Sequence, residues 1–132
     1  MKLKYTFKKQ EHLKSKKTIE LLFKKGNVID EFPVRVVWIK TILHEKDTYS
    51  KVAFSVPKRL LKKAVDRNRI KRLLRESYRL NKHPLIYRLE KEGIQIALMI
   101  IYGSDYLTSF KTIERKIIVI LNRLEALISN RV

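Results

Sequence analysis

Cysteine is absent from this 132-residue chain, and histidine is rare. Without thiols, disulfide bonds and thiolate metal ligands are excluded, and the three histidines stand too far apart in the sequence for a typical zinc site. Long apolar runs are missing too, because the longest, residues 96–102, is far too short to cross a bilayer. No apolar stretch follows the charged N-terminus, which argues against a secretory signal. These absences favour a cytoplasmic protein that does not enter a membrane.

Acidic residues are scarce compared with basic ones. Thirteen Asp and Glu stand against 31 Lys and Arg, which gives a formal net charge of +18. Such an excess repels itself in the folded chain, so it does little for stability, but it suits a polyanionic partner. Nucleic acid is the first candidate for that partner, and an anionic membrane surface is the second.

The length of the chain fits one domain over residues 1–132. Hydrophobic residues make up 45% of the chain, which is enough to build a core in a domain of this size. Residues 1–14 are polar and basic, and we expect them to form a flexible arm outside that core.

Hydrophobic periodicity and turn residues predict the order helix, strand, strand, helix, strand, helix, with a short extra strand as a variant. Ser15 and Ser109 are suited to cap helices, while Gly26 and Pro84 are suited to end them. The order is that of an α+β domain in which helices pack on a small mixed sheet, and the third strand, apolar on both faces, is expected at its centre. The expected elements are a helix over 15–26, strands over 34–39 and 51–56 joined by a polar hairpin loop over 44–50, a helix over 64–80, a short helical turn over 85–90, a strand over 94–101, and a last helix whose buried stripe is Ile113, Ile117, Ile120, Leu121, Leu124, Leu127 and Ile128.

Basic residues crowd into residues 58–75, where nine Lys and Arg accompany one acid, Asp66. The helical stripe that includes Ile70 and Leu74 is expected to face the core, so the cations gather on the opposite face. One guanidinium group can bind two oxygens of a phosphate at once, and Asn68 can reach a base edge or a 2′-hydroxyl. We therefore predict an RNA-binding surface, with a merely solvated charged face and a membrane-surface helix as the alternatives.

Two segments of the chain match a known signature. They are FSVPKR at residues 54–59 and KAVDRNRIKRLLRE at residues 63–76, and together they resemble the protein subunit of bacterial ribonuclease P from about residue 7 onward. The resemblance implies a small sheet packed with helices and a left-handed βαβ crossover, similar to a domain of a small-subunit ribosomal protein and of elongation factor G. Composition alone does not predict that handedness, because the right-handed form is the general rule.

The resemblance also implies a division of labour. In this family an RNA is the catalyst, and it hydrolyses a phosphodiester to release the 5′ leader of precursor tRNA. The protein is expected to be a monomer that binds the catalytic RNA and the precursor tRNA and has no catalytic residue of its own. Magnesium is expected in the holoenzyme, held by the RNA and the substrate and not by protein side chains.

Specific residues of this chain match the family's two RNA-contacting regions. Ile19 and Phe23 match the apolar cleft positions of the first helix, although Ile19 replaces an aromatic residue and so loses base stacking. Residues 60–63 replace a family turn that usually contains Gly, and they form a turn one residue longer. Phe23 and Trp38 also suit an ordinary core. The expected leader cleft comprises Ile19, Phe23, Arg35, Val37, Trp38 and Ser55, with Arg35, Val37 and Trp38 as alternatives on one strand. The expected RNA-binding set comprises Lys58, Arg59, Lys62, Lys63, Arg67, Asn68, Arg69, Lys71, Arg72 and Arg75.

Protein-borne catalytic groups are not indicated. No paired carboxylates stand at a helical spacing suited to metal-dependent phosphodiester cleavage, and Ser55 has no histidine near it in the sequence. Two other hypotheses compete with a ribonuclease P subunit. One is an accessory RNA-binding protein such as a ribosomal protein, and the other is a self-sufficient nuclease, which the missing carboxylates disfavour.

Overall fold

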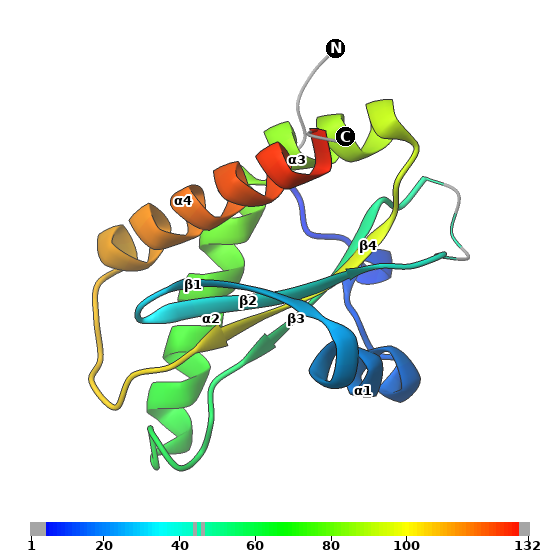
Figure 1. Ribbon diagram of the computed structural model, residues 1–132. Helices are drawn as coiled ribbons and strands as arrows, with labels where there is room; N and C mark the ends of the chain where they lie inside the picture. Colours follow the sequence, from blue (N-terminus) through cyan, green and yellow to red (C-terminus); the bar gives the residue numbers. More distant parts are fainter. Residues whose placement is uncertain (1–4, 44, 46, 130–132) are drawn as a thin grey trace.

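The computed structural model describes residues 5–129 apart from residues 44 and 46. A four-stranded sheet carries one α-helix on one face and three on the other (Figure 1). In chain order the elements are a 3₁₀ turn η1 (Lys9–Glu11), α1 (Lys16–Lys25), β1 (Asn27–Glu31), β2 (Val34–Lys40), β3 (Ser50–Ser55), α2 (Ala64–Asn81), α3 (His83–Glu92), β4 (Ile96–Tyr102) and α4 (Phe110–Ser129).

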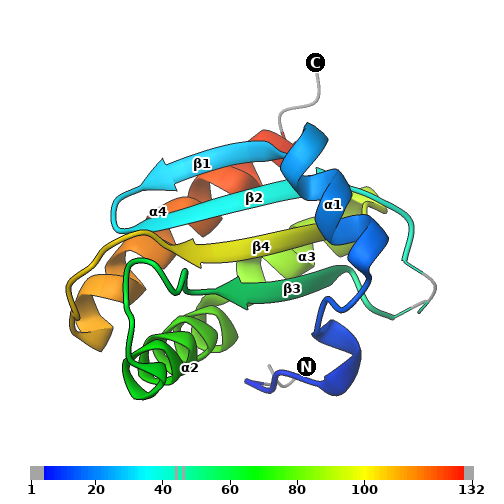
Figure 2. The same cartoon turned by 90° about the horizontal axis from the view of Figure 1, so that it is seen from below.

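The strands lie in the order β1-β2-β4-β3. β2 pairs antiparallel with both β1 and β4, whereas β3 and β4 run parallel. The chain passes from β3 to β4 through α2 and α3. Figure 2, which views the sheet from the α1 side, shows that this crossover connection is left-handed. The handedness is that implied by the family resemblance and opposite to the general rule.

The observed sheet differs from the predicted one in which strands are joined by a hairpin. The predicted hairpin between the strands over 34–39 and 51–56 is wrong, because β4 lies between the corresponding strands β2 and β3. The true hairpin joins β2 to β1, the short extra strand. Period-2 patterns show which face of a strand is buried but not which strand lies beside it, and the doubly apolar β4 takes the central position.

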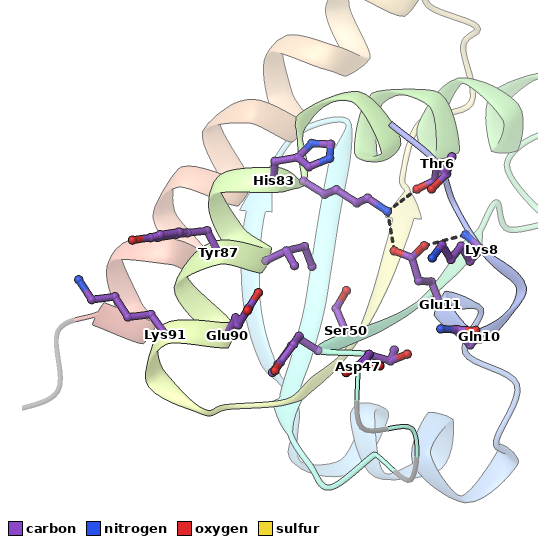
Figure 3. A pocket seen from close by; sticks show the side chains of 14 residues that line it. Thr6, Lys8, Gln10, Glu11, Asp47, Ser50, His83, Tyr87, Glu90 and Lys91 are labelled. Atoms are coloured by element: carbon purple, nitrogen blue, oxygen red, sulfur yellow. Dashed lines mark hydrogen bonds and ion pairs between the residues drawn. The ribbon is translucent and has the colours of Figure 1, made fainter. Parts of the chain in front are cut away.

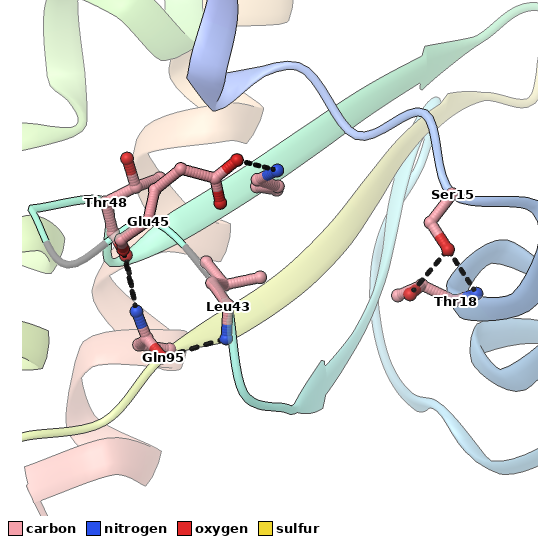
Figure 4. Close-up of polar contacts among 7 residues, drawn as sticks. Ser15, Thr18, Leu43, Glu45, Thr48 and Gln95 are labelled. Carbon is pink, nitrogen blue, oxygen red and sulfur yellow. Dashed lines mark hydrogen bonds and ion pairs between the residues drawn. The ribbon is translucent and has the colours of Figure 1, made fainter.

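The loop from β2 to β3 crosses the end of β4 and is held there by one side chain. Gln95 accepts a hydrogen bond from the backbone N–H of Leu43 at 2.8 Å and donates to the carbonyl of Thr48 at 2.8 Å (Figure 4). These bonds satisfy backbone groups that a hairpin would have paired between its two strands. Residues 44 and 46 of the predicted hairpin loop lie outside the described residues.

The main core fills the space between the sheet and α2, α3 and α4. On α2, Ile70, Leu74 and Tyr78 are fully buried, as the helical stripe predicts. Of the residues expected to be buried on α4, Leu127 is the exception, since 54% of its surface is exposed. Leu124 and Ile128 already occupy the line of contact, and Leu127 lies to one side of it.

A smaller core lies under α1. Leu22 packs there with Val37 of β2 and Met99 of β4. Ser15 caps the helix by accepting a hydrogen bond from the Thr18 N–H at 3.2 Å (Figure 4). Gly26 ends it at a point without room for a side chain, because a Cβ there would stand 2.4 Å from a methyl group of Val37 on β2.

The N-terminal segment packs on the domain, so the expectation of a flexible arm is wrong for residues 5–13. The Phe7 ring lies 5.7 Å from that of Phe54 and 6.1 Å from that of Tyr78. The buried ammonium of Lys82, at the junction of α2 and α3, lies 2.5 Å from the Glu11 carboxylate (Figure 3). Residues 5–13, here called the N-terminal strap, are anchored by these contacts and cover one end of the main core. Residues 1–4 lie outside the described residues.

No helix in the part of the chain that the structure describes combines the length and the apolar character that a membrane crossing requires.

Candidate nucleic-acid interface

Helix α2 presents its cations on one face. Because Ile70 and Leu74 turn inward, the side chains at Asn68, Arg69 and Arg72 point to solvent. The predicted set divides into exposed residues (Lys58, Arg59, Lys62, Lys63, Asn68, Arg69, Arg72 and Arg75) and two half-buried ones (Arg67 and Lys71).

The turn before α2, residues 57–63, is anchored from both sides. Leu61 is buried in the main core, and the amides of Leu60 and Leu61 donate to the Pro57 carbonyl at 3.1 and 3.3 Å. Arg67 closes the turn from the helix, because its Nη1 donates to the carbonyls of Leu61 at 2.9 Å and of Lys62 at 2.8 Å. These bonds hold a turn that contains no glycine. Sequence reasoning assigned Arg67 only to RNA, because nothing in the sequence pairs it with those carbonyls.

The cationic face ends at Arg75. The next cation along α2, Arg79, forms an ion pair with Glu76 at 2.6 Å. Their hydrogen bond lowers the pKa of the Glu76 carboxyl below its ordinary value. Arg79 also donates to the backbone carbonyl of Tyr5. Its guanidinium therefore holds the N-terminal segment on α2 and is less available to a partner.

Of the cleft residues predicted on the strands, all but one lie on the sheet face beneath α1. Strand alternation places Arg35 and Val37 on the α1 side and Trp38 on the opposite side. Trp38 is 6% exposed and belongs to the main core, so its assignment to the leader cleft is wrong. Val37 is a buried floor residue under α1.

Arg35 and Ser55 lie on the same row of this face. Arg35 pairs across β2 with Ile101 of β4, and Ile101 pairs with Ser55 of β3. The row stands near the start of β2, whereas α1 crosses the sheet toward its other end (Figure 2). Part of the face beside α1 is therefore open, and it offers a cation, a hydroxyl and an apolar side chain.

Helix α1 contributes residues of two kinds. Ile19 packs against the small core under the helix, while Phe23 is 64% exposed. An aromatic ring this exposed is not a core residue, so the core alternative for Phe23 is wrong. Its exposure leaves the face of the ring available for stacking.

Arg35 forms a cross-strand ion pair with Asp30, which sequence reasoning missed because the register of β1 was not known. The guanidinium and carboxylate lie 2.7 Å apart, and both side chains are more than half exposed. The hydrogen bond from Arg35 lowers the pKa of the Asp30 carboxyl. Exposed pairs of this kind contribute little free energy, so a phosphate can compete for Arg35.

A separate cavity lies between the N-terminal strap and α3. Its walls include Glu11, Ser50 and Tyr87 (Figure 3), and none of the predicted RNA-binding or cleft residues lines it. Among the described residues, no three His, Asp or Glu side chains come together as a potential metal site.

Comparison with known proteins identifies relatives along most of the chain. The family model of ribonuclease P matches residues 7–125. The ribonuclease P protein component of Porphyromonas gingivalis is 39% identical over 107 residues, which cover 81% of this chain and 77% of the relative. That of Chlorobium phaeobacteroides is 32% identical over 121 residues, which cover 85% of this chain and 83% of the relative.

Solved structures share the fold. The ribonuclease P protein of Thermotoga maritima matches with a TM-score of 0.67 at 24% identity, over 86% of this chain and 96% of that one. The protein of Staphylococcus aureus matches with a TM-score of 0.65 at 20% identity, over 86% and 94%. At these identities the likeness concerns the fold, and it confirms the predicted α+β architecture.

Proposed function

The chain belongs to the ribonuclease P protein family, and from this premise we propose that it binds the catalytic RNA and the 5′ leader of precursor tRNA and so assists removal of the leader. The observation that carries the proposal is the exposed cationic face formed by the turn before α2 and by α2 itself. The family's Arg-Asn-Arg signature stands at its centre, at residues 67–69.

The cationic face is suited to the catalytic RNA. Eight of its ten predicted residues are exposed, and the turn is held in place by the buried Leu61 and by Arg67. A preorganised array of cations loses less side-chain freedom when it binds phosphates than a mobile one does. Neutralising about six phosphates would make the affinity fall ~10³-fold or more between 50 and 200 mM salt.

The open part of the sheet face is suited to the single-stranded leader. Phe23 offers a stacking surface that tolerates any base. Arg35 offers a guanidinium for a phosphate, and Ser55 offers a hydroxyl that can donate or accept. These side chains contact the phosphates and the faces of the bases, so they bind RNA without requiring a particular base sequence. A protein that binds many different leaders needs such contacts.

In this proposal the reacting groups belong to RNA. The magnesium of the holoenzyme, held by RNA and substrate, would stabilise charge on the phosphodiester oxygens. The protein's own residues bind and orient: the α2 face holds the catalytic RNA, and the α1 side of the sheet holds the leader beside it. Holding two reactants in register raises their effective concentration.

The deciding experiment mixes the protein with the catalytic RNA and a precursor tRNA at low magnesium and moderate salt. We expect cleavage at the mature 5′ end to be faster with the protein than with the RNA alone. A rate equal to that of RNA alone would contradict the proposed function, and cleavage by the protein without RNA would indicate a self-sufficient nuclease.

Phe23→Ala is expected to weaken binding of leader-bearing precursor tRNA by about tenfold, because stacking of one base contributes about 1–3 kcal/mol. Binding of mature tRNA without a leader should change less than twofold. The measurement is the dissociation constant of each tRNA from the holoenzyme. Leu127→Ala serves as the control, because Leu127 is an apolar residue that is also more than half exposed but lies on the opposite side of the sheet. An equal loss of affinity for leaderless tRNA would contradict the assignment of Phe23 to the cleft.

A further inference from the structure

Two strongly exposed aromatic rings stand at the end of the sheet that α1 leaves open. Phe32 is 71% exposed in the turn between β1 and β2, and Tyr106 is 75% exposed in the loop between β4 and α4. Both connections leave the sheet on the same side (Figures 1 and 2). The proposed contacts of the α2 face and of the α1 side of the sheet use neither ring.

The loops that carry the rings are fixed to each other. The Gly103 N–H donates to the Pro33 carbonyl at 2.7 Å, which ties the β4–α4 loop to the β1–β2 turn. The Tyr106 N–H donates to Ser104 Oγ at 3.1 Å, and the Tyr102 hydroxyl donates to the Tyr106 carbonyl. Both rings are therefore presented to solvent by backbone that is already ordered, which reduces the entropy that binding must overcome.

The positive turn before α2 starts from the same end of the sheet. The register aligns the end of β1 with the start of β2, the end of β4 and the end of β3, since Glu31 pairs with Val34, Val34 with Tyr102, and Ser55 with Ile101. Neighbouring strands lie about 4.8 Å apart, so three steps from β1 to β3 span roughly 14 Å. The two rings and the cations of residues 57–63 thus occupy one edge of the molecule.

We propose that Phe32 and Tyr106 form an aromatic platform that stacks on unpaired nucleotides of the catalytic RNA, next to the phosphates held by residues 57–63. The inference rests on the proposed function and adds a binding surface to it. Every base has a π-face, so stacking on exposed rings needs no particular sequence. The neighbouring Glu31 is paired with Arg123 at 3.1 Å, which reduces its repulsion of RNA.

The position of the platform selects the catalytic RNA over other partners. The cations of residues 57–63 lie beside the platform, whereas α1, which carries the proposed stacking residue Phe23, crosses the sheet toward its other end (Figure 2). Arg35 and Ser55, the polar contacts proposed for the leader, stand at the platform's end of the sheet but on the face that α1 covers. A second copy of this chain carries the same formal charge of +18 over its whole length and would meet the cations of residues 57–63 with its own, so self-association there is opposed by repulsion.

The test measures binding of the catalytic RNA without substrate, as a function of salt. We expect Phe32→Ala and Tyr106→Ala each to weaken binding by about tenfold and the double variant by more. Because the rings are uncharged, the slope of log affinity against log salt should stay unchanged, whereas Lys62→Ala should reduce it by about one. Phe32→Tyr and Tyr106→Phe, which keep the rings, should bind within twofold of the original protein.

Tyr87→Ala is the matched control, since this ring is 60% exposed but stands on α3. Loss of affinity in this control equal to that of the platform variants would overturn the proposal, as would wild-type affinity in the double variant. A loss seen only with leader-bearing precursor tRNA would also overturn it, because the rings would then belong to the substrate surface. If the unaltered protein does not bind the catalytic RNA, the proposed function itself fails.

An independent readout does not depend on removing a side chain. Phe32→Trp places a fluorophore on the platform, and stacking on a base should quench its emission as the catalytic RNA is added. Quenching that saturates at the dissociation constant of the complex supports the platform. Saturated binding without a change in emission contradicts it.

Discussion

Glu11→Leu is expected to lower the free energy of unfolding by about 3 kcal/mol, a large effect for a residue in a segment with no sequence signal of order. The Lys82 side chain is 7% exposed and lies 2.5 Å from the Glu11 carboxylate. Lys82 also donates to the Thr6 carbonyl, and its ammonium stands 5.8 Å from the centre of the Phe7 ring. Without the carboxylate, a positive charge remains buried beside the neutral Thr6 carbonyl, and breaking such a pair typically costs about 3–5 kcal/mol.

A double-mutant cycle separates the ion pair from packing. Lys82→Met alone should also destabilise the protein, but Glu11→Leu with Lys82→Met should recover much of the loss, because an apolar pair of similar volume removes both charges together. Urea unfolding of the four proteins gives the coupling energy. Additive losses would show that the two residues act independently and would contradict the role given to the pair.

The exposed Arg35–Asp30 pair provides the control for burial. Asp30→Asn removes one charge from an ion pair of normal length, 2.7 Å, whose partners are both more than half exposed. We expect a change below about 1 kcal/mol. A loss as large as that of Glu11→Leu would mean that exposure does not distinguish the two pairs.

Arg67→Ala is expected to weaken binding of the catalytic RNA on the order of 100-fold, whereas Arg69→Ala should cost about tenfold. A charge-assisted hydrogen bond contributes about 1.5–3 kcal/mol, and 1.4 kcal/mol corresponds to a factor of ten. Arg69 is exposed and loses only its own contact. Arg67 also holds the carbonyls of Leu61 and Lys62, so its removal frees the turn that carries four further cations (Lys58, Arg59, Lys62 and Lys63).

The salt dependence of binding distinguishes the two arginines. Loss of one phosphate contact reduces the slope of log affinity against log salt by about one, which is the expectation for Arg69→Ala. Arg67→Ala should reduce the slope by two or more. It should also speed amide hydrogen exchange in residues 57–63 of the free protein, which Arg69→Ala leaves unchanged. Identical slopes and exchange rates would show that Arg67 is an ordinary phosphate ligand.

The sequence predicted most of the local structure because local structure depends on nearby residues. Spacing of apolar residues predicted the helices at residues 64–80 and from 109, and Ser15 and Gly26 mark the first helix as expected. The same spacing separated the exposed arginines of α2 from its buried stripe. A specific motif at residues 63–76 then identified the family, which the matches over residues 7–125 confirm.

Strand neighbours and long-range pairs were not predictable in the same way. The sequence left Arg35, Val37 and Trp38 as alternatives for the cleft, because it did not show which face of their strand meets α1. The sheet order moved β4 between β2 and β3, and a register known only in three dimensions paired Asp30 with Arg35.

By itself, then, the sequence determined the composition of the protein's working surface: an excess of positive charge, a helix with one cationic face, and a family signature in its middle. These properties depend on residue type and on spacing within a few turns of helix. Only the tertiary structure decided that the N-terminal strap is anchored on Lys82, that Arg67 closes the basic turn, and that Phe32 and Tyr106 share one edge with it. These arrangements depend on an ion pair, on side-chain hydrogen bonds to the backbone and on a backbone hydrogen bond between two loops, and no pattern in the sequence predicts which groups meet.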